Sequence, residues 1–237
     1  MPSKFLTATW KHLIMANYIV DPAMLTPYLP YQTEMDNYKG NVYVSLVGFM
    51  FEDTRVLGFK IPFHVNFEEV NLRFYVRYND NGEWKRGTVF IKEIVPKRAI
   101  SFVANTVYGE KYCTRKMRHF FNPCDHEIHL GYHWKQNRRW NKLEATIEPA
   151  AIPMQPGSEE EFIAEHYWGY SKQKNNTTHE YNVQHPAWNI FPVKDYLVDC
   201  DFAALYGDAF APLEKSRPNS VLVAEGSAIA VLKKRKL

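Results

Sequence analysis

The stretch "NFEEVNLRFYVRY" (residues 66–78) alternates between two kinds of side chain along its whole length. One set is mainly apolar: Glu68, Val70, Leu72, Phe74, Val76 and Tyr78. The other set is mostly polar: Glu69, Asn71, Arg73, Tyr75 and Arg77. Since successive side chains of a strand point to opposite faces, this period of two predicts a β-strand. "NDNGEW" (79–84) follows, and its Asn81-Gly82 pair is typical of a tight hairpin turn.

Strand-like runs dominate the rest of the chain as well. They are rich in β-branched and aromatic residues and lie at 41–51, 86–95, 99–108, 112–121, 126–135, 142–150 and 219–235. Helical signals are confined to 21–29, 157–170 and 201–208, the first two with Asp21 and Ser158 in the N-cap position. Many strands joined by short turns predict a mainly β fold with a few peripheral helices. We expect one antiparallel sheet closed into a β-barrel, forming a single domain over residues 1–237.

Composition narrows the functional classes. The chain has 237 residues, a formal net charge of +3 and 46% hydrophobic residues, which supports a packed core and does not favour nucleic acid as a partner. The start lacks the apolar segment of a secretory signal, and no run is long enough to span a membrane. Three scattered cysteines indicate free thiols in a reducing compartment. We therefore expect a cytoplasmic protein without a membrane partner, and a solvated tail at the basic run 233–236.

The common catalytic and nucleotide-binding motifs are missing from the chain. It contains no GxGxxG, GxxxxGK[ST], GxSxG or HExxH sequence. His126, His129 and His133 lie in a strand-like run, where the first two point to opposite sides, so they do not favour a metal site. No metal and no cofactor are expected.

The polar set of 66–78 has two interpretations. If the sheet closes, Glu69, Asn71 and Arg73 line its interior, where Arg73 is suited to bind a carboxylate through two parallel hydrogen bonds. Glu69 and Arg73 are roughly 13 Å apart along a strand, so they would bracket a small ligand. Otherwise the set is the solvated outer face of an amphipathic strand. Periodicity alone does not decide between the two.

"FIKEIVPKRAI" (90–100) offers a second candidate. A lysine that forms an imine must be unprotonated near neutral pH, and both burial and a neighbouring cation favour that state. Lys97 has Arg98 beside it and apolar runs on either side. An ordinary pair of solvated charges is the alternative.

Several segments, in the same order, resemble the YqjF-like family of uncharacterised proteins (DUF2071). They include "NYIVDPAMLTPYLP" (17–30), "GNVYVSLVGFMF" (40–51), "EEVNLRFYVRY" (68–78), "FIAEHYWGY" (162–170) and "SVLVAEGSAIAVL" (220–232). That family is distantly similar to acetoacetate decarboxylase, which "YIVDPAMLTPYLP" and "VPKRA" also resemble. The resemblance implies a cone-shaped barrel with the nucleophile at Lys97 and its neighbouring cation at Arg98.

The same resemblance implies further pocket residues. A glutamate of the decarboxylase site matches Glu69, and an arginine near its N-terminus falls at Lys11. A second active-site glutamate lands on Ser45, which is a departure from the decarboxylase pattern.

Three functional hypotheses follow. In the first, Lys97 attacks a small oxo-acid and the imine serves as electron sink for a decarboxylase-like lyase, with Glu69 transferring protons. In the second, the same pocket binds a small molecule, such as a carboxylate, without catalysis, through Arg73, Tyr18, His185 and aromatic walls. The third is an assembly role in a homo-oligomer, with aromatic residues covering the interface. The sequence leaves open whether the protein is an enzyme.

Overall fold

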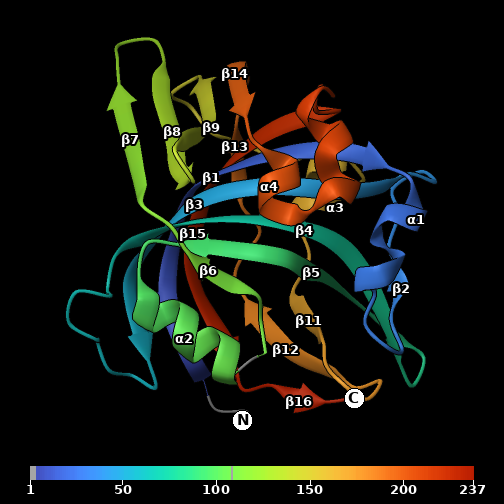
Figure 1. The fold of residues 1–237 in the computed structure, drawn as a ribbon. Helices are drawn as coiled ribbons and strands as arrows, with labels where there is room; N and C mark the ends of the chain where they lie inside the picture. The colour runs from blue at the N-terminus through green and yellow to red at the C-terminus, as the bar shows by residue number, and fades with distance from the viewer. Residues whose placement is uncertain (1–3, 108) are drawn as a thin grey trace.

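Two antiparallel-rich sheets make up most of the molecule, and the computed structural model describes residues 4–107 and 109–237 (Figure 1). The long strands of the large sheet are β1 (Lys4–Val20), β3 (Val42–Val56), β4 (Phe67–Asp80), β5 (Glu83–Val95), β11 (Trp168–Lys172), β12 (Thr178–Gln184) and β15 (Ser220–Leu232). Its short strands are β2 (Glu34–Met35), β6 (Tyr112–Thr114), β10 (Ile152–Pro153), β13 (Asn189–Phe191) and β16 (Arg235–Lys236). The second sheet contains β7 (Met117–Pro123), β8 (Ile128–Gln136), β9 (Arg139–Ile147) and β14 (Val193–Asp199). The expected mainly β fold is confirmed.

The large sheet curls back on itself. Its strand order is β10-β13-β15-β1-β3-β4-β5-β11-β12-β16, and β12 also pairs with β15 through Val183–Val231 and Gln184–Ala230. The expectation that the sheet is antiparallel throughout is wrong at two places, because β5 pairs in parallel with both β11 and β6. Both partners are short, and each is reached by a connection long enough to reverse the chain direction.

Both faces of β4 are buried. Val70, Leu72, Phe74 and Val76 belong to a core shared with the second sheet, where Trp134 and Leu143 are fully buried. Glu69, Asn71 and Arg73 occupy the other face and are 2%, 1% and 8% exposed. The interpretation of this polar set as a solvated outer face is therefore wrong, and the alternative of an interior face is confirmed.

The helices are short and peripheral, as expected, although one was not anticipated. They are α1 (Pro22–Leu25), α2 (Arg98–Val107), α3 (Glu159–Ala164) and α4 (Phe202–Tyr206), with 3₁₀ turns at Thr26–Tyr28 and Asp208–Glu214. Asp21 and Ser158 cap α1 and α3 as predicted, by accepting from the backbone N–H groups of Ala23 and Glu161. The helix expected over 157–170 is shorter, because 168–172 forms β11. In the described residues no helix is both long enough and apolar enough to cross a membrane.

Residues 99–107 lie in α2 and do not form the strand expected over 99–108, of which Tyr108 lies outside the described residues. Short apolar runs rich in Val and Ile fit a strand or a buried helix equally well. Tertiary packing decides here, since Ala99, Ile100 and Ala104 share a helical face that covers the interior of the curled sheet.

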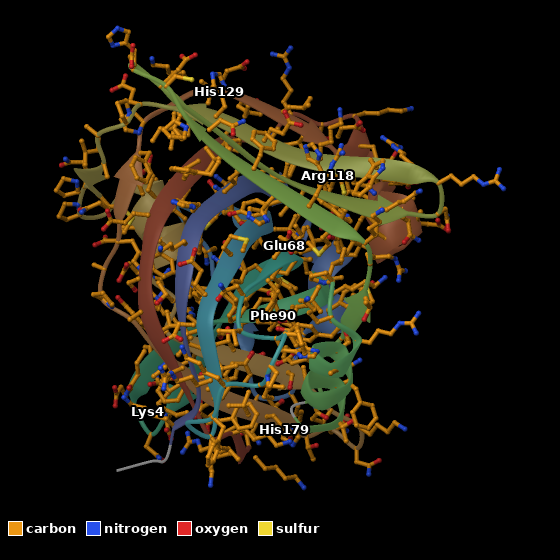
Figure 2. All side chains as sticks on the ribbon, turned by 90° about the vertical axis from the view of Figure 1, so that its left-hand side faces the viewer. Lys4, Glu68, Phe90, Arg118, His129 and His179 are labelled. Atoms are coloured by element: carbon orange, nitrogen blue, oxygen red, sulfur yellow. The ribbon has the colours of Figure 1, made fainter. Side chains whose placement is uncertain are left out.

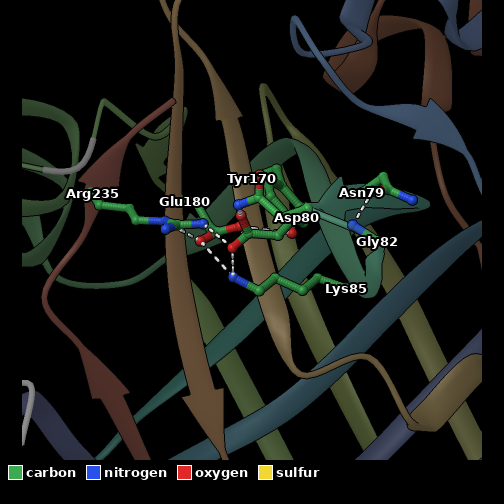
Figure 3. A network of polar contacts seen from close by, with 8 residues as sticks. Asn79, Asp80, Gly82, Lys85, Tyr170, Glu180 and Arg235 are labelled. Atoms are coloured by element: carbon green, nitrogen blue, oxygen red, sulfur yellow. Dashed lines mark hydrogen bonds and ion pairs between the residues drawn. The ribbon is translucent and has the colours of Figure 1, made fainter.

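The basic run at the C-terminus is part of the fold and not a solvated tail. Arg235 lies in β16, which pairs with β12, and it donates hydrogen bonds to Glu180 (2.6 Å) and Asp80 (2.7 Å) (Figure 3). Glu180 is fully buried and also accepts from the hydroxyl of Tyr170 at 3.0 Å. Lys85 lies 3.6 Å from the same carboxylate. The network thus supplies partners to a buried charge.

We expect Arg235→Ala to lower the free energy of unfolding by about 2 kcal/mol, because Glu180 then stays buried with Lys85, 3.6 Å away, as its remaining cation. Half of the Arg235 side chain is exposed, so the cost falls below that of a fully buried pair. Urea unfolding of the variant measures this, with exposed Lys233→Ala as the control. Equal stability of the two variants would contradict the role given to Arg235.

Candidate functional site

A cavity of about 190 Å³ lies inside the curve of the large sheet. In Figure 2, Phe90 lies within this curve, between the second sheet, which carries Arg118 and His129, and the end where His179 lies. Most of the cavity wall is apolar. The polar side chains that line it are those of Thr54, His64, Glu69, Asn71, Arg73, Thr88, Glu93, Glu110, Tyr112, His166, Tyr181 and His185.

One wall of the cavity is aromatic. The ring of Trp10 lies 5.2 Å from that of Phe49 and 6.2 Å from that of Trp188, in edge-to-face arrangements. His185 stacks on Trp188 with 4.1 Å between ring centroids. Burial, helped by the charge of Arg73, lowers the pKa of His185. A neutral imidazole therefore belongs to this flat wall, which suits the apolar body of a ligand.

Three carboxyl groups also line the cavity. Glu69 accepts hydrogen bonds from the amide of Asn71 (2.9 Å) and the hydroxyl of Tyr112 (3.0 Å). Burial outweighs these hydrogen bonds and the charge of Arg73, and raises the pKa of Glu69 to about 7. A carboxyl group poised near neutral pH can donate or accept a proton.

Glu93 and Glu110 complete this carboxyl cluster, which we define as Glu69, Glu93 and Glu110. Burial is the main cause that raises the pKa of Glu93 well above its ordinary value, followed by the charges of Glu110 and Glu69. Burial also raises the pKa of Glu110 to about 7, against a hydrogen bond from Tyr181 at 3.0 Å. At neutral pH the three groups therefore share fewer than three negative charges.

A β-bulge places Glu93 in the cavity. Opposite β4, Leu72 pairs with Lys92 but Arg73 pairs with Phe90, so Ile91 is an extra residue in β5. Thr88 and Phe90 face the cavity, and an unbroken alternation would bring Lys92 there next. The bulge instead turns Lys92 toward the carbonyl of Leu205 on the other side of the sheet and Glu93 into the cavity.

Arg73 is a buried cation with weak partners. Its Nη2 lies 3.5 Å from both the sulfur of Met15 and the carbonyl of Ile163. Its Nε has no acceptor among the residues that the structure describes, and none of the ion pairs found among them includes Arg73. A buried guanidinium in this state is well placed to receive an anionic group.

His166 reaches the cavity from the loop after α3 and is fixed by Asp36. Its Nε2 lies 3.3 Å from Asp36, which also accepts a hydrogen bond from Arg86 at 2.6 Å. Burial opposes ionisation of Asp36, but the hydrogen bonds from His166 and Arg86 prevail and lower its pKa to about 2. Burial lowers the pKa of His166 to about 4, so its neutral ring donates to Asp36 and directs Nδ1 away from it.

The structure brings four of the sequence-predicted site residues together at the cavity: Glu69, Asn71, Arg73 and His185. The other five lie elsewhere. Lys11 forms a half-exposed ion pair with Glu52 (2.7 Å), and Tyr18 packs against Phe202 in the core on the opposite side of the sheet. Ser45 is fully buried and hydrogen-bonded to Asn17 (2.6 Å) and Tyr75 (2.7 Å).

Lys97 and Arg98, the remaining two, follow the end of β5 and are not among the residues lining the cavity. The strand ends at Val95, and the bend at Pro96 leads directly into α2. Lys97 is half-buried and Arg98 exposed at the start of that helix. The helix presents Ala99, Ile100 and Ala104 to the cavity in their place.

Sequence reasoning missed Glu93, Glu110, Tyr112, His166 and Trp10. The bulge conceals Glu93, because period-two alternation assigns it to the wrong face. Tyr112 reaches Glu69 because Asn105 of α2 holds its backbone through two hydrogen bonds (2.9 and 2.7 Å). No local signal in the sequence marks such contacts. In residues 4–107 and 109–237 no group of three or more His, Cys, Asp or Glu side chains is arranged to hold a metal ion.

Comparisons with solved structures agree with this architecture. Acetoacetate decarboxylase from Legionella pneumophila superposes with a TM-score of 0.67 at 13% identity, covering 100% of this chain and 88% of that one. The enduracididine biosynthesis enzyme MppR superposes with a TM-score of 0.71 at 11% identity and the same coverage. At such identities the likeness shows a shared fold alone.

Sequence comparison gives the family. The uncharacterised protein YqjF of Bacillus subtilis (strain 168) is 26% identical over 183 residues, which are 76% of this chain and 72% of that protein. The family model DUF2071, described as an uncharacterised conserved protein, matches residues 7–228. The chain therefore belongs to the DUF2071 family and has an acetoacetate decarboxylase-like fold.

Proposed function

We propose that this protein binds a small organic carboxylate in the cavity, with the curled sheet acting as a closed barrel around it. The buried guanidinium of Arg73 is the observation that carries the proposal. A cation that is 8% exposed and has no carboxylate partner among the described residues costs free energy, which a ligand carboxylate would offset through charge-assisted hydrogen bonds. The aromatic wall formed by Trp10, Phe49 and Trp188 then packs against the ligand's apolar body.

The fold neighbours support a small acid as ligand. MppR has been solved in complex with pyruvate, and that structure superposes on this chain with a TM-score of 0.65. Pyruvate is a small carboxylate, in accord with the chemistry of Arg73, although the pocket here is lined by this chain's own carboxyl cluster.

Binding of a panel of aromatic and aliphatic carboxylates, measured by calorimetry, tests the proposal. We expect Arg73→Met to weaken the best carboxylate by ~10- to 100-fold, the usual worth of a charge-assisted hydrogen bond. Arg77→Met is the matched control, because Arg77 lies on the same strand but is half-exposed and paired with Glu34. Equal loss in both variants, or unchanged binding in Arg73→Met, would reject the role of Arg73. Native mass spectrometry of freshly purified protein shows whether a ligand is retained.

An imine-forming lyase is the second candidate function, favoured by the decarboxylase-like fold and by titratable Glu69 in the cavity. This function requires the amine of Lys97, which is half-buried at the start of α2, to reach the carbonyl group of an oxo-acid in the cavity. Borohydride trapping with an oxo-acid panel, followed by peptide mass spectrometry, examines this directly. An adduct at Lys97 that disappears in Lys97→Ala would establish the lyase. If no oxo-acid of the panel forms an adduct and a bound ligand stays chemically unchanged, the lyase function is rejected and ligand binding remains as the function.

A further inference from the structure

Two buried acceptors face the cavity without a donor. Oδ1 of Asn71 and Oε2 of Glu93 have no hydrogen-bond partner in residues 4–107 and 109–237. Asn71 is 1% exposed and Glu93 3% exposed, and both side chains line the cavity. The amide of Asn71 is oriented by the hydrogen bond that its Nδ2 donates to Glu69, which leaves Oδ1 as an acceptor. Buried polar groups are nearly always hydrogen-bonded, so a missing donor is indicated.

These two acceptors lie side by side. Asn71 on β4 and Glu93 on β5 are register partners, and such pairs have Cβ atoms about 5 Å apart. Glu69 is two residues from Asn71 on the same face of β4, and Glu110 is close enough to influence Glu93. One of the two acceptors thus belongs to the carboxyl cluster, and the other is hydrogen-bonded to it through Glu69.

Cations do not compensate this cluster directly. None of the ion pairs among the described residues joins Glu69, Glu93 or Glu110 to a lysine or arginine. The charges of Lys111 and Lys234 lower the pKa of Glu110, and the charge of Arg73 lowers that of Glu69. The site therefore combines unused acceptors with incompletely balanced negative charge, and both favour a donor-rich cation.

A buried donor that has no acceptor in the described residues, the Nε of Arg73, belongs to the next residue on the same face of β4. Arg73 follows Asn71 by two residues on the same face, roughly 7 Å along the strand. Its Nε has no acceptor within the part of the chain that the structure describes. A ligand would therefore have to supply hydrogen-bond donors at Asn71 and Glu93 and an acceptor at Arg73.

We propose that the ligand is amphoteric: besides the carboxylate at Arg73 it carries a basic nitrogen group that docks between Asn71 and Glu93. An ammonium or amidinium group supplies the donors that both acceptors lack, and the carboxyl cluster balances its charge. Asn71 and Arg73 are roughly 7 Å apart along the strand, and a flat apolar body that joins the ligand's two groups would contact the aromatic wall. This inference rests on the proposed function and names the ligand class of the same cavity.

Three small molecules with the same benzene ring test the carboxylate site and the nitrogen site separately. They are 4-(aminomethyl)benzoate, which carries both groups, 4-methylbenzoate, which lacks the nitrogen, and 4-methylbenzylamine, which lacks the carboxylate. Calorimetry at pH 8 is suitable, because Glu69 and Glu110, with pKa values of about 7, are then mostly ionised and the amine is still protonated. We expect 4-(aminomethyl)benzoate to bind at least ~10-fold more tightly than either partial probe.

Glu93→Gln provides the second measurement, since it keeps the side-chain volume and removes the carboxyl group, and with it the capacity to carry a negative charge. We expect it to abolish the advantage of the aminomethyl group and to leave the affinity for 4-methylbenzoate within ~2-fold. Glu83→Gln, at an exposed position of the same strand, is the control and should change neither affinity. The probe comparison on the unaltered protein stands by itself if Glu93→Gln does not fold.

The outcomes are distinguishable. If 4-methylbenzoate binds through Arg73 but the aminomethyl group adds nothing, the amphoteric ligand is rejected and the carboxylate-binding function stands. If 4-methylbenzylamine alone binds as tightly as the full probe, the nitrogen site stands and the carboxylate role of Arg73 is rejected. Failure of all three probes and of the wider carboxylate panel would reject both proposals.

Discussion

Replacing Gly226 with alanine is expected to lower the free energy of unfolding by about 4 kcal/mol. Gly226 lies in β15 with φ of +82°, a conformation that costs an L-residue about 1–2 kcal/mol. A Cβ atom at this position would lie 2.1 Å from the carbonyl oxygen of Trp10, and that oxygen belongs to the paired backbone of β1. The strands must separate locally, at a further cost of about 1–3 kcal/mol. Trp10 would move with them, which disturbs the aromatic wall.

Gly82→Ala separates the two causes. Gly82 has φ of +98° in the β4–β5 turn, but a Cβ there would meet no atom within 4 Å. This control should therefore show the conformational cost alone, about 1–2 kcal/mol by urea unfolding. Similar losses in both variants would mean that β15 accommodates the added methyl group without parting from β1.

Glu69→Gln is expected to stabilise the protein at pH 8 by about 3 kcal/mol and to change its stability by less than about 0.5 kcal/mol at pH 4.5. Burial raises the pKa of Glu69 from the ordinary 4.5 to about 7, and this difference corresponds to about 3 kcal/mol. Below pH 4.5 the carboxyl is protonated in both the folded and the unfolded states. Between pH 4.5 and 7 the folded state binds more protons, so stability falls as pH rises. Above pH 7 the full cost of the buried charge is present, and glutamine removes it.

Urea unfolding at several pH values between 4.5 and 8 measures this difference. Comparison of variant with unaltered protein is essential, because His166 acts in the opposite direction: its pKa of about 4 makes stability rise with pH between 4 and 6.5. Glu83→Gln serves again as an exposed control. A difference between Glu69→Gln and the unaltered protein that does not change with pH would contradict the titration assigned to Glu69.

The alternation of residues 66–78 predicted β4 and its hairpin with β5, because both faces of that strand are buried and each demands its own set of side chains. The same alternation placed Glu69, Asn71 and Arg73 together on one face. It could not decide whether that face was interior, since closure of the sheet depends on pairing between segments far apart in the chain, such as β12 and β15. The domain organisation over 1–237 stays a prediction.

The sequence could not predict where Lys97 lies relative to the cavity. Its neighbours suggested a reactive amine, but the apolar run after it folds as α2, and the contact of that helix with the cavity determines which residues line it. Aligned residues can occupy different surroundings in distant relatives when a strand ends one or two positions earlier. At 13% identity to the decarboxylase, such differences are expected.

Because Ile91 is an extra residue, the register of the backbone, and not the composition of β5, determines whether a carboxylate or an amine of this strand enters the cavity. Lys92 and Glu93 are adjacent, and the bulge alone determines which of them enters. If β5 continued without the bulge, Lys92 would enter the cavity in place of Glu93, which would exchange a carboxylate for an amine without any change of sequence. A sequence alignment of relatives that places a gap on the wrong side of Ile91 would compare residues on opposite faces of the sheet. The ligand class of a relative is therefore better inferred from its strand pairing than from residue identity.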